Sequence, residues 1–224
     1  MNAKTFNAVP TAGTALPARN ADPAAALRSL WRREPRLVGF ALLLLALMLP
    51  AALALGLDGR ELRGVNVWIK PLKFMASVAL LALTTAWFAG HLLSQARQGR
   101  ALSALVWTLT ATGGFEVAYI TLQAALGEAS HYNVADAVHA LMYTLMGLAA
   151  LVLTATQPWL AWLLWRHGQP TIAPAYRLAV LFGLVLTFAL SASAGAAGFS
   201  GCRLHIARCQ AGARGSSGGI AGHS

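Results

Sequence analysis

Residues 37–57 read LVGFALLLLALMLPAALALGL, a run that contains no charged residue. At 1.5 Å per residue, a helix over this run is long enough to cross a hydrocarbon layer of about 30 Å. The whole chain has the same character, because 57% of its 224 residues are hydrophobic and only 11% are charged. Soluble proteins carry roughly 25% charged residues. The composition therefore indicates a multi-pass membrane protein and excludes a soluble globule.

Four further apolar stretches have the length of a membrane span, and they run from Leu72 to Leu93, Ala101 to Leu126, Ala135 to Gln157 and Tyr176 to about Gly198. Long, uniformly apolar runs satisfy their backbone polar groups in lipid as helices, whereas alternating runs of about 10 residues would indicate a barrel. The sequence shows no strand pattern. It predicts an all-α fold, a polytopic transmembrane helix bundle of about five spans over residues 36–198. We expect Pro158 to bend the end of the fourth helix along the membrane surface.

The two ends of the chain differ from this apolar middle. Residues 1–35 are polar and contain four prolines, so we expect a flexible cytoplasmic tail. A cleaved secretory signal ending near residues 52–54 is the alternative interpretation of the first span. Residues 199–224 lack acids and are rich in Gly, Ala, Ser and Arg, which indicates either a disordered tail or a slipped reading frame. Cys202, His205 and Cys209 are too few for a zinc site, and we expect no metal and no cofactor.

Basic residues near the span ends predict the orientation. Ten of them lie on the side of the amino terminus, against four in loops on the other side, namely Arg60, Arg63, Lys70 and Lys73. This asymmetry places the amino terminus on the inner, cytoplasmic side of the membrane. The basic residues form no stripe that would suit nucleic acid, but they lie where lipid head groups are. The expected partners are the lipid bilayer and a small-molecule ligand, and the oligomeric state is left open.

Polar side chains inside the spans indicate where function resides, because an ionisable group at membrane depth is costly and faces the bundle interior. Glu116, Tyr119 and Gln123 follow one another at spacings of three and four residues, which places them on one face of the third span. Burial disfavours a charged carboxylate, so we expect Glu116 to be protonated at rest. Gly113 and Gly114, one turn earlier, permit close helix packing or a kink.

The fourth span carries a matching polar face, with Asp136, His139 and Tyr143 at positions i, i+3 and i+7. A short turn joins the third and fourth spans, so we expect them to be antiparallel neighbours. Equal depths then pair Tyr143 with Glu116, and His139 with Tyr119.

A third polar face begins at the outer end of the second span with Lys70 and Lys73. From there a lysine can reach Asp136 or a bound anion by snorkelling. Together the three faces predict an outward-facing pocket that binds a polar ligand or relays a proton, formed by Lys70, Lys73, Glu116, Tyr119, Gln123, His131, Asn133, Asp136, His139 and Tyr143.

Three functional classes fit such a pocket. The first is the binding or transport of a small polar or anionic ligand with proton coupling. The second is a membrane-embedded oxidoreductase or transferase that acts on a lipid or quinone, with Glu116 or His139 as acid or base. The third is a structural or assembly role, in which the polar groups join helices at about 0.6 kcal/mol per contact. No Gly-rich phosphate loop and no HExxH motif occurs in the chain, so kinase and zinc-protease chemistry lack support.

Two stretches, residues 64–92 and 116–133, resemble a family of uncharacterised bacterial multi-pass membrane proteins. The pattern Asn-x-Trp-Ile-Lys-Pro-x-Lys-Phe matches residues 66–74, and the pattern Glu-x-x-Tyr-Ile-x-x-Gln with Ser-His-Tyr-Asn matches residues 116–133. The resemblance covers about the middle half of the chain. It implies the helical membrane architecture but no activity. Members of that family continue into more hydrophobic segments after the fifth span, and this chain departs from them there.

Overall fold

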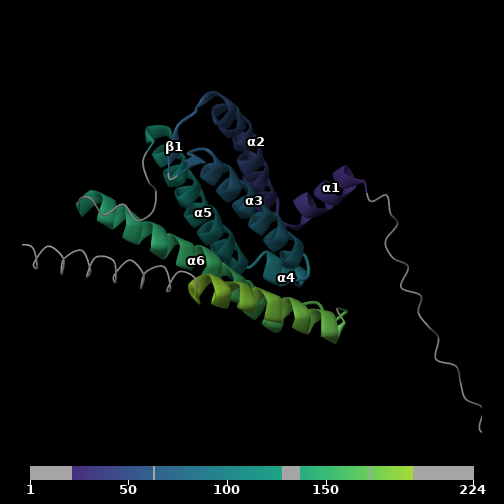
Figure 1. Cartoon of the computed structure of the whole chain (residues 1–224). Coiled ribbons are helices and arrows are strands. Elements are labelled where there is room, and N and C mark those ends of the chain that lie inside the picture. Colours follow the sequence, from purple (N-terminus) through teal and green to yellow (C-terminus); the bar gives the residue numbers. More distant parts are fainter. Residues whose placement is uncertain (1–21, 63, 128–136, 172, 194–224) are drawn as a thin grey trace, which may run out of the picture.

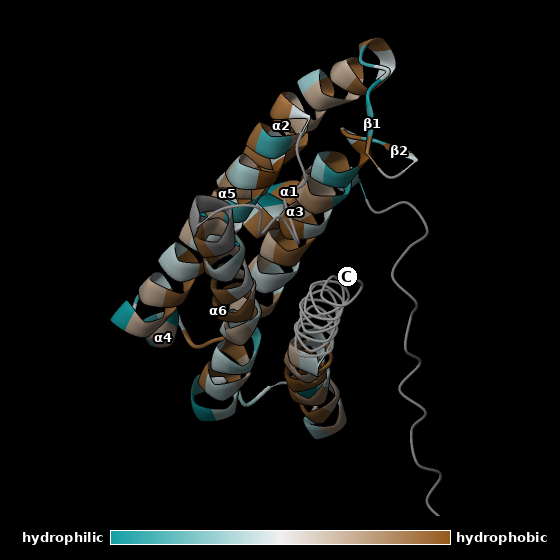
Figure 2. Cartoon of the chain, turned by 60° about the vertical axis from the view of Figure 1, so that its left-hand side comes forward, coloured by the Kyte–Doolittle hydropathy of each residue, from teal (hydrophilic) through white to brown (hydrophobic). Residues whose placement is uncertain are grey.

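The computed structural model describes residues 22–62, 64–127, 137–171 and 173–193, and it is a bundle of helices (Figure 1). Five of its helices are long and apolar enough to cross a membrane. They are α2 (Pro35–Leu57), α3 (Ile69–Ala89), α5 (Arg100–Leu126), the Leu141–His167 part of α6 (Ala137–His167), and the helix Pro174–Ser193. The prediction of an all-α polytopic bundle with about five spans is confirmed. Many large apolar residues of these helices are exposed, as expected where lipid is the solvent, and Figure 2 shows hydrophobic residues along the length of the helices.

A short helix precedes the first span. α1 (Pro23–Arg33) begins with Asp22, whose carboxylate accepts a hydrogen bond of 3.0 Å from the Ala24 amide, and Pro23 occupies the first helical position, where a missing N–H costs nothing. Leu30 packs on the core of the bundle, and Arg33 donates to the backbone carbonyl of Trp87 at the end of α3. Residues 23–33 are therefore not the flexible segment that we expected, while the rest of that segment up to residue 21 lies outside the described residues.

The loop between α2 and α3 contains a small hairpin. β1 (Glu61–Leu62) pairs antiparallel with β2 (Val65–Asn66), and Gly64 between them has a φ of 76°. The sequence showed no strand pattern because two-residue strands are too short to alternate visibly. The expectation of a chain without strands is wrong at this loop.

The fourth span is not interrupted at Pro158. α6 continues through this proline to His167 as one helix of 31 residues, which is about 46 Å long. It is longer than the hydrocarbon layer of about 30 Å, and Figure 1 shows it inclined to α5. Neighbouring helices can satisfy the backbone groups that a proline leaves unpaired in a membrane helix. Pro158, where we expected the helix to turn along the surface, is therefore an interior residue of α6.

Helices α2, α3, α5 and α6 meet around one glycine. A Cβ atom added to Gly113 of α5 would lie 2.9 Å from Val78 of α3, 3.6 Å from Leu153 of α6 and 3.7 Å from Phe40 of α2. α5 continues without interruption through Gly113 and Gly114. Of the two sequence interpretations, close packing is therefore the one that the structure supports.

Candidate functional site

The end of the bundle at which α2 and α5 end and α3 begins is called the outer end, after the predicted orientation. The buried face of α5 carries a polar stripe in this half of the bundle. Glu116 and Gln123 are buried, with 1% and 5% of their surface exposed, and Tyr119 between them is half-buried. The Gln123 side-chain amide donates a hydrogen bond of 2.8 Å to the Tyr119 hydroxyl. The spacing of these residues thus predicted a shared face, and two of them contact each other on it.

Glu116 is the deepest member of the stripe. It lies ten residues before the end of α5 at Leu126, which is about 15 Å along the helix axis. Neither of its carboxyl oxygens has a hydrogen-bond partner within the described part of the chain, and the same holds for the Gln123 carbonyl oxygen. No hydrogen bond therefore joins Glu116 to Tyr143, which is half-buried on α6 and which we expected at the same depth.

The remaining candidate site residues lie on α6 and in the segment before it, and the structure describes only part of them. His139 belongs to α6, but its side chain lies outside the described residues, and so do His131, Asn133 and Asp136 altogether. Among the residues that are described, no three His, Cys, Asp or Glu side chains lie close enough to hold a metal ion.

Lys70 and Lys73 stand in the first turn of α3. Both side chains are exposed, whereas Pro71 and Met75 on the other side of the same turn are buried. The two lysines therefore do not share an enclosed space with the buried carboxyl of Glu116. They lie at the end of the second span where the sequence predicted them, and the side of the membrane that this end faces stays a prediction.

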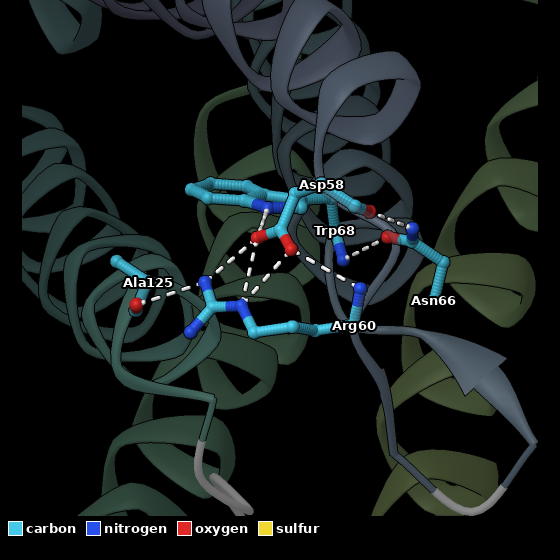
Figure 3. A network of polar contacts seen from close by, with 5 residues as sticks. All are labelled: Asp58, Arg60, Asn66, Trp68 and Ala125. Carbon is cyan, nitrogen blue, oxygen red and sulfur yellow. Dashed lines mark hydrogen bonds and ion pairs between the residues drawn. The ribbon is translucent and has the colours of Figure 1, made fainter.

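A polar network that sequence reasoning missed lies beside this stripe, at the outer ends of α2, α3 and α5 (Figure 3). Its centre is Asp58, directly after α2, whose carboxylate accepts hydrogen bonds from the Arg60 guanidinium at 2.7 to 3.0 Å and from the Trp68 indole at 2.9 Å. The Asn66 side chain donates to the Asp58 carbonyl at 2.6 Å and accepts from the Trp68 amide at 2.9 Å. Asn66 and Trp68, which carry the family resemblance, thus hold the hairpin closed.

The same network fastens the hairpin to α5. Arg60 donates a hydrogen bond of 3.0 Å to the carbonyl of Ala125, in the last turn of α5. A cation is favoured there, because the carbonyl end of a helix carries partial negative charge. Gly127 ends α5 with a φ of 75°, and a Cβ atom at this position would lie 3.0 Å from the Arg60 guanidinium. The network is a clasp between the α2–α3 loop and the last turn of α5.

The clasp also fixes the charge of Asp58. The Arg60 guanidinium, and after it the Trp68 indole, hold the pKa of the Asp58 carboxyl well below its usual range. The Asp58 carboxylate raises the pKa of the Arg60 guanidinium in return. Both groups are charged at neutral pH and bound to each other, so they stabilise the loop and do not exchange protons in this pH range. The signal in the sequence was the close succession of Asp58, Arg60 and Asn66 around glycines that favour turns.

An apolar groove of about 460 Å³ opens between α2, α3 and α5. Leu44 and Leu47 of α2, Met75 of α3 and Val117 of α5 contribute to its walls, and Trp68 lies at its outer end. Glu116 is not among the lining residues, although Val117 is. Successive residues of a helix point about 100° apart, so the carboxyl faces away from the groove.

The five spans, the apolar outer surface and the polar stripe define a polytopic α-helical membrane protein with an ionisable group in its interior. No protein family model, no curated protein and no solved structure matches the chain. The family resemblance of the two motifs stays a prediction. What the chain does is therefore argued from its own residues.

Proposed function

We propose that this chain is a bacterial inner-membrane protein with a cytoplasmic amino terminus that binds or transports a small polar or anionic ligand, and that Glu116 carries the coupled proton. The observation that carries the proposal is the burial of Glu116 without a hydrogen-bond partner among the described residues. A carboxyl group held only as a contact between helices would need such a partner. Leaving a buried polar group unpaired costs roughly 1–3 kcal/mol, so a residue of this kind is expected to have a function.

The surroundings of Glu116 support proton binding more than fixed charge. The charged form is disfavoured in a low-dielectric interior, and no basic side chain among the described residues forms an ion pair with it. Gain and loss of a proton then change the charge of the bundle interior by a full unit. Tyr119 and Gln123 extend the stripe outward from Glu116 along the same helix face, which supports access from the outer side.

The experiment uses the full chain in vesicles that contain a pH-sensitive dye, under a potassium diffusion potential that is negative inside. Internal acidification is recorded without solute and with a panel of carboxylates, amino acids and inorganic anions. We expect one class of solute to increase proton uptake, and Glu116→Gln to abolish the increase. Glu61→Gln is the matched control, since Glu61 is an exposed acid of β1 outside the spans. Solute-dependent uptake that survives in Glu116→Gln would overturn the proposal.

The apolar groove favours one alternative, a membrane-embedded oxidoreductase or transferase that takes a lipid or quinone from the bilayer. The groove has the apolar lining that such a substrate needs. However, an acid or base must lie within hydrogen-bond reach of the reacting group, and Glu116 does not line the groove. Enzymatic chemistry therefore has less support than proton-coupled binding.

A further inference from the structure

The basic end of the bundle contains α1, the starts of α2 and α5, and the ends of α3 and α6. It differs from the outer end in its charge. Within the described ranges it contains two acids, Asp22 and Glu34, each in an ion pair with an arginine. It also contains eight arginines, namely Arg28, Arg32, Arg33, Arg36, Arg97, Arg100, Arg166 and Arg177. Six arginines thus remain outside the ion pairs of the described part. This end attracts anions.

Two of these arginines are held against exposed tryptophans of α6. The Arg177 guanidinium lies 5.5 Å from the ring centre of Trp165, and that of Arg166 lies 5.7 Å from the ring centre of Trp162. Tryptophan settles at the level of lipid head groups, so both cations are placed at that level. Arg177 also donates to the backbone carbonyl of Trp165, which fixes its direction.

Arg177 has unused hydrogen-bonding capacity. A guanidinium carries five N–H donors in a planar fork that matches a phosphate. The Nε atom of Arg177 is shielded from solvent and has no acceptor within the residues that the structure describes. A shielded donor of a charged group without an acceptor is costly, and a neighbouring anion lowers that cost.

An apolar groove of about 580 Å³ begins at Trp165, whose ring the Arg177 guanidinium contacts. Leu178, Leu181, Phe182 and Val185 of the helix Pro174–Ser193 line it, together with Trp165. These four positions follow helical spacing and form one stripe about 10 Å long. Only 6% of the most apolar stretch of this helix is buried, and Phe182 is 72% exposed.

Arg177 and the groove follow one another like the two parts of an anionic phospholipid that they would bind, the phosphate head group and the acyl chain. The cation lies at the end of the helix, at head-group level, and the apolar stripe runs from it toward the middle of the membrane. We propose that the groove between α6 and the helix Pro174–Ser193 is a binding site for an anionic phospholipid, with the phosphate at Arg177 and Trp165 and an acyl chain along Leu178, Phe182 and Val185. A polar solute does not fit an apolar stripe, and a zwitterionic lipid gains less from the excess of arginines.

The test measures lipid retention by native mass spectrometry of the full chain in detergent. The probes are phosphatidylglycerol and phosphatidylcholine with identical acyl chains, and inorganic phosphate. One arginine near an anionic surface contributes ~1 kcal/mol, which is about a fivefold change in binding. We expect phosphatidylglycerol to be retained about fivefold better than phosphatidylcholine, and inorganic phosphate not to displace it. This comparison uses the unmodified chain and does not depend on the folding of a variant.

A pair of variants then locates the site. Arg177→Gln and Arg100→Gln remove the same charge from the same end. Arg177 contacts Trp165 in the wall of the groove and directly precedes the lining residue Leu178, whereas Arg100 is exposed at the start of α5, which contributes no lining residue. We expect Arg177→Gln to lower phosphatidylglycerol retention to the level of phosphatidylcholine, and Arg100→Gln to change it less than twofold. Equal retention of the two lipids, equal effects of the two variants, displacement by inorganic phosphate, or a lipid-free dimer would each overturn the proposal. The last two results would indicate a free-anion site and a second copy of the chain, respectively.

Discussion

Replacement of Gly113 by alanine should weaken the bundle, because four helices converge on this residue. The new methyl group would lie 2.9 Å from the Val78 Cγ1 atom, about 0.6 Å inside the usual carbon contact distance. Valine in a helix has essentially one side-chain rotamer, so α3 itself must move. Overpacking of this kind costs ~1–3 kcal/mol, and alanine returns about 1 kcal/mol through its helix propensity. We expect a net loss of ~0–2 kcal/mol.

The neighbouring glycine provides the control. A Cβ atom at Gly114 would meet only Phe40, at 3.9 Å, so Gly114→Ala gains the helix propensity without overpacking. The two variants should therefore differ in their free energy of unfolding by ~1–3 kcal/mol. The assay is equilibrium unfolding in mixed micelles, followed by circular dichroism. A Gly113→Ala protein that is as stable as Gly114→Ala would refute the four-helix contact.

Three further predictions concern the ends of the bundle. Gly127→Ala should destabilise the chain by ~1–2 kcal/mol in the same unfolding assay, because alanine resists a φ of 75° and its methyl group would press on Arg60. Arg36→Ala should cost roughly 1–3 kcal/mol there, since it removes two hydrogen bonds from the buried carboxylate of Glu34. The third concerns pH: the pKa of Asp58 is lower in the folded chain than when unfolded, so its stabilisation is complete above about pH 4 and is lost at more acidic pH.

Matched variants decide each of these predictions. Gly59→Ala should be nearly neutral, because a Cβ atom there meets nothing within 4 Å. Arg28→Ala breaks only an exposed ion pair and should cost ~0–1 kcal/mol. The pH effect is read from the free energy of unfolding, which should fall as the pH drops below about 4, and Asp58→Asn should reduce that fall. Losses as large in the controls as in the variants, or an equal fall in Asp58→Asn, would contradict the clasp and the buried pair.

The spans could be predicted because hydropathy is a local property, and their boundaries could be predicted less well. The second span was expected to begin at Leu72, but α3 begins at Ile69 and includes Lys70 and Pro71. Proline is tolerated in the first turn of a helix, where its missing N–H has no partner to lose. The sequence interpretation treated this proline as part of the loop. The helix therefore starts one turn earlier than hydropathy alone indicates.

The parts that could not be predicted depend on contacts between distant residues. α1 is fastened to α3 by Arg33, whose hydrogen bond to the Trp87 carbonyl joins residues 54 positions apart. The hairpin is fastened to α5 by Arg60 across 65 positions. No window of the sequence contains both partners of either contact. A local pattern therefore shows a polar tail and a polar loop where the structure has a helix and a clasp.

The candidate site, too, was predictable where it depends on spacing within one helix, and not where it depends on packing between helices. The common face of Glu116, Tyr119 and Gln123 follows from residue spacing within one helix and was predictable. The pairing of Glu116 with Tyr143 required α5 and α6 to be nearly parallel, so that equal residue counts meant equal depths. α6 is inclined to α5 (Figure 1), and this assumption fails. An inclination between two helices depends on how their side chains pack against each other, which the spacing within one helix does not reveal.

Contacts of α5 on both sides of Glu116 along the helix hold this residue in position. About one turn inward, Gly113 locks α5 against α2, α3 and α6, and near the outer end Arg60 binds the Ala125 carbonyl. Between two fixed points α5 cannot turn to bring the carboxyl toward the lipid or the head groups. Leucine at this position would remove a buried group that has no partner among the described residues, and would increase stability by roughly 1–3 kcal/mol. We infer that the rigid frame serves to hold a destabilising acid in place, as the proposed proton carrier requires.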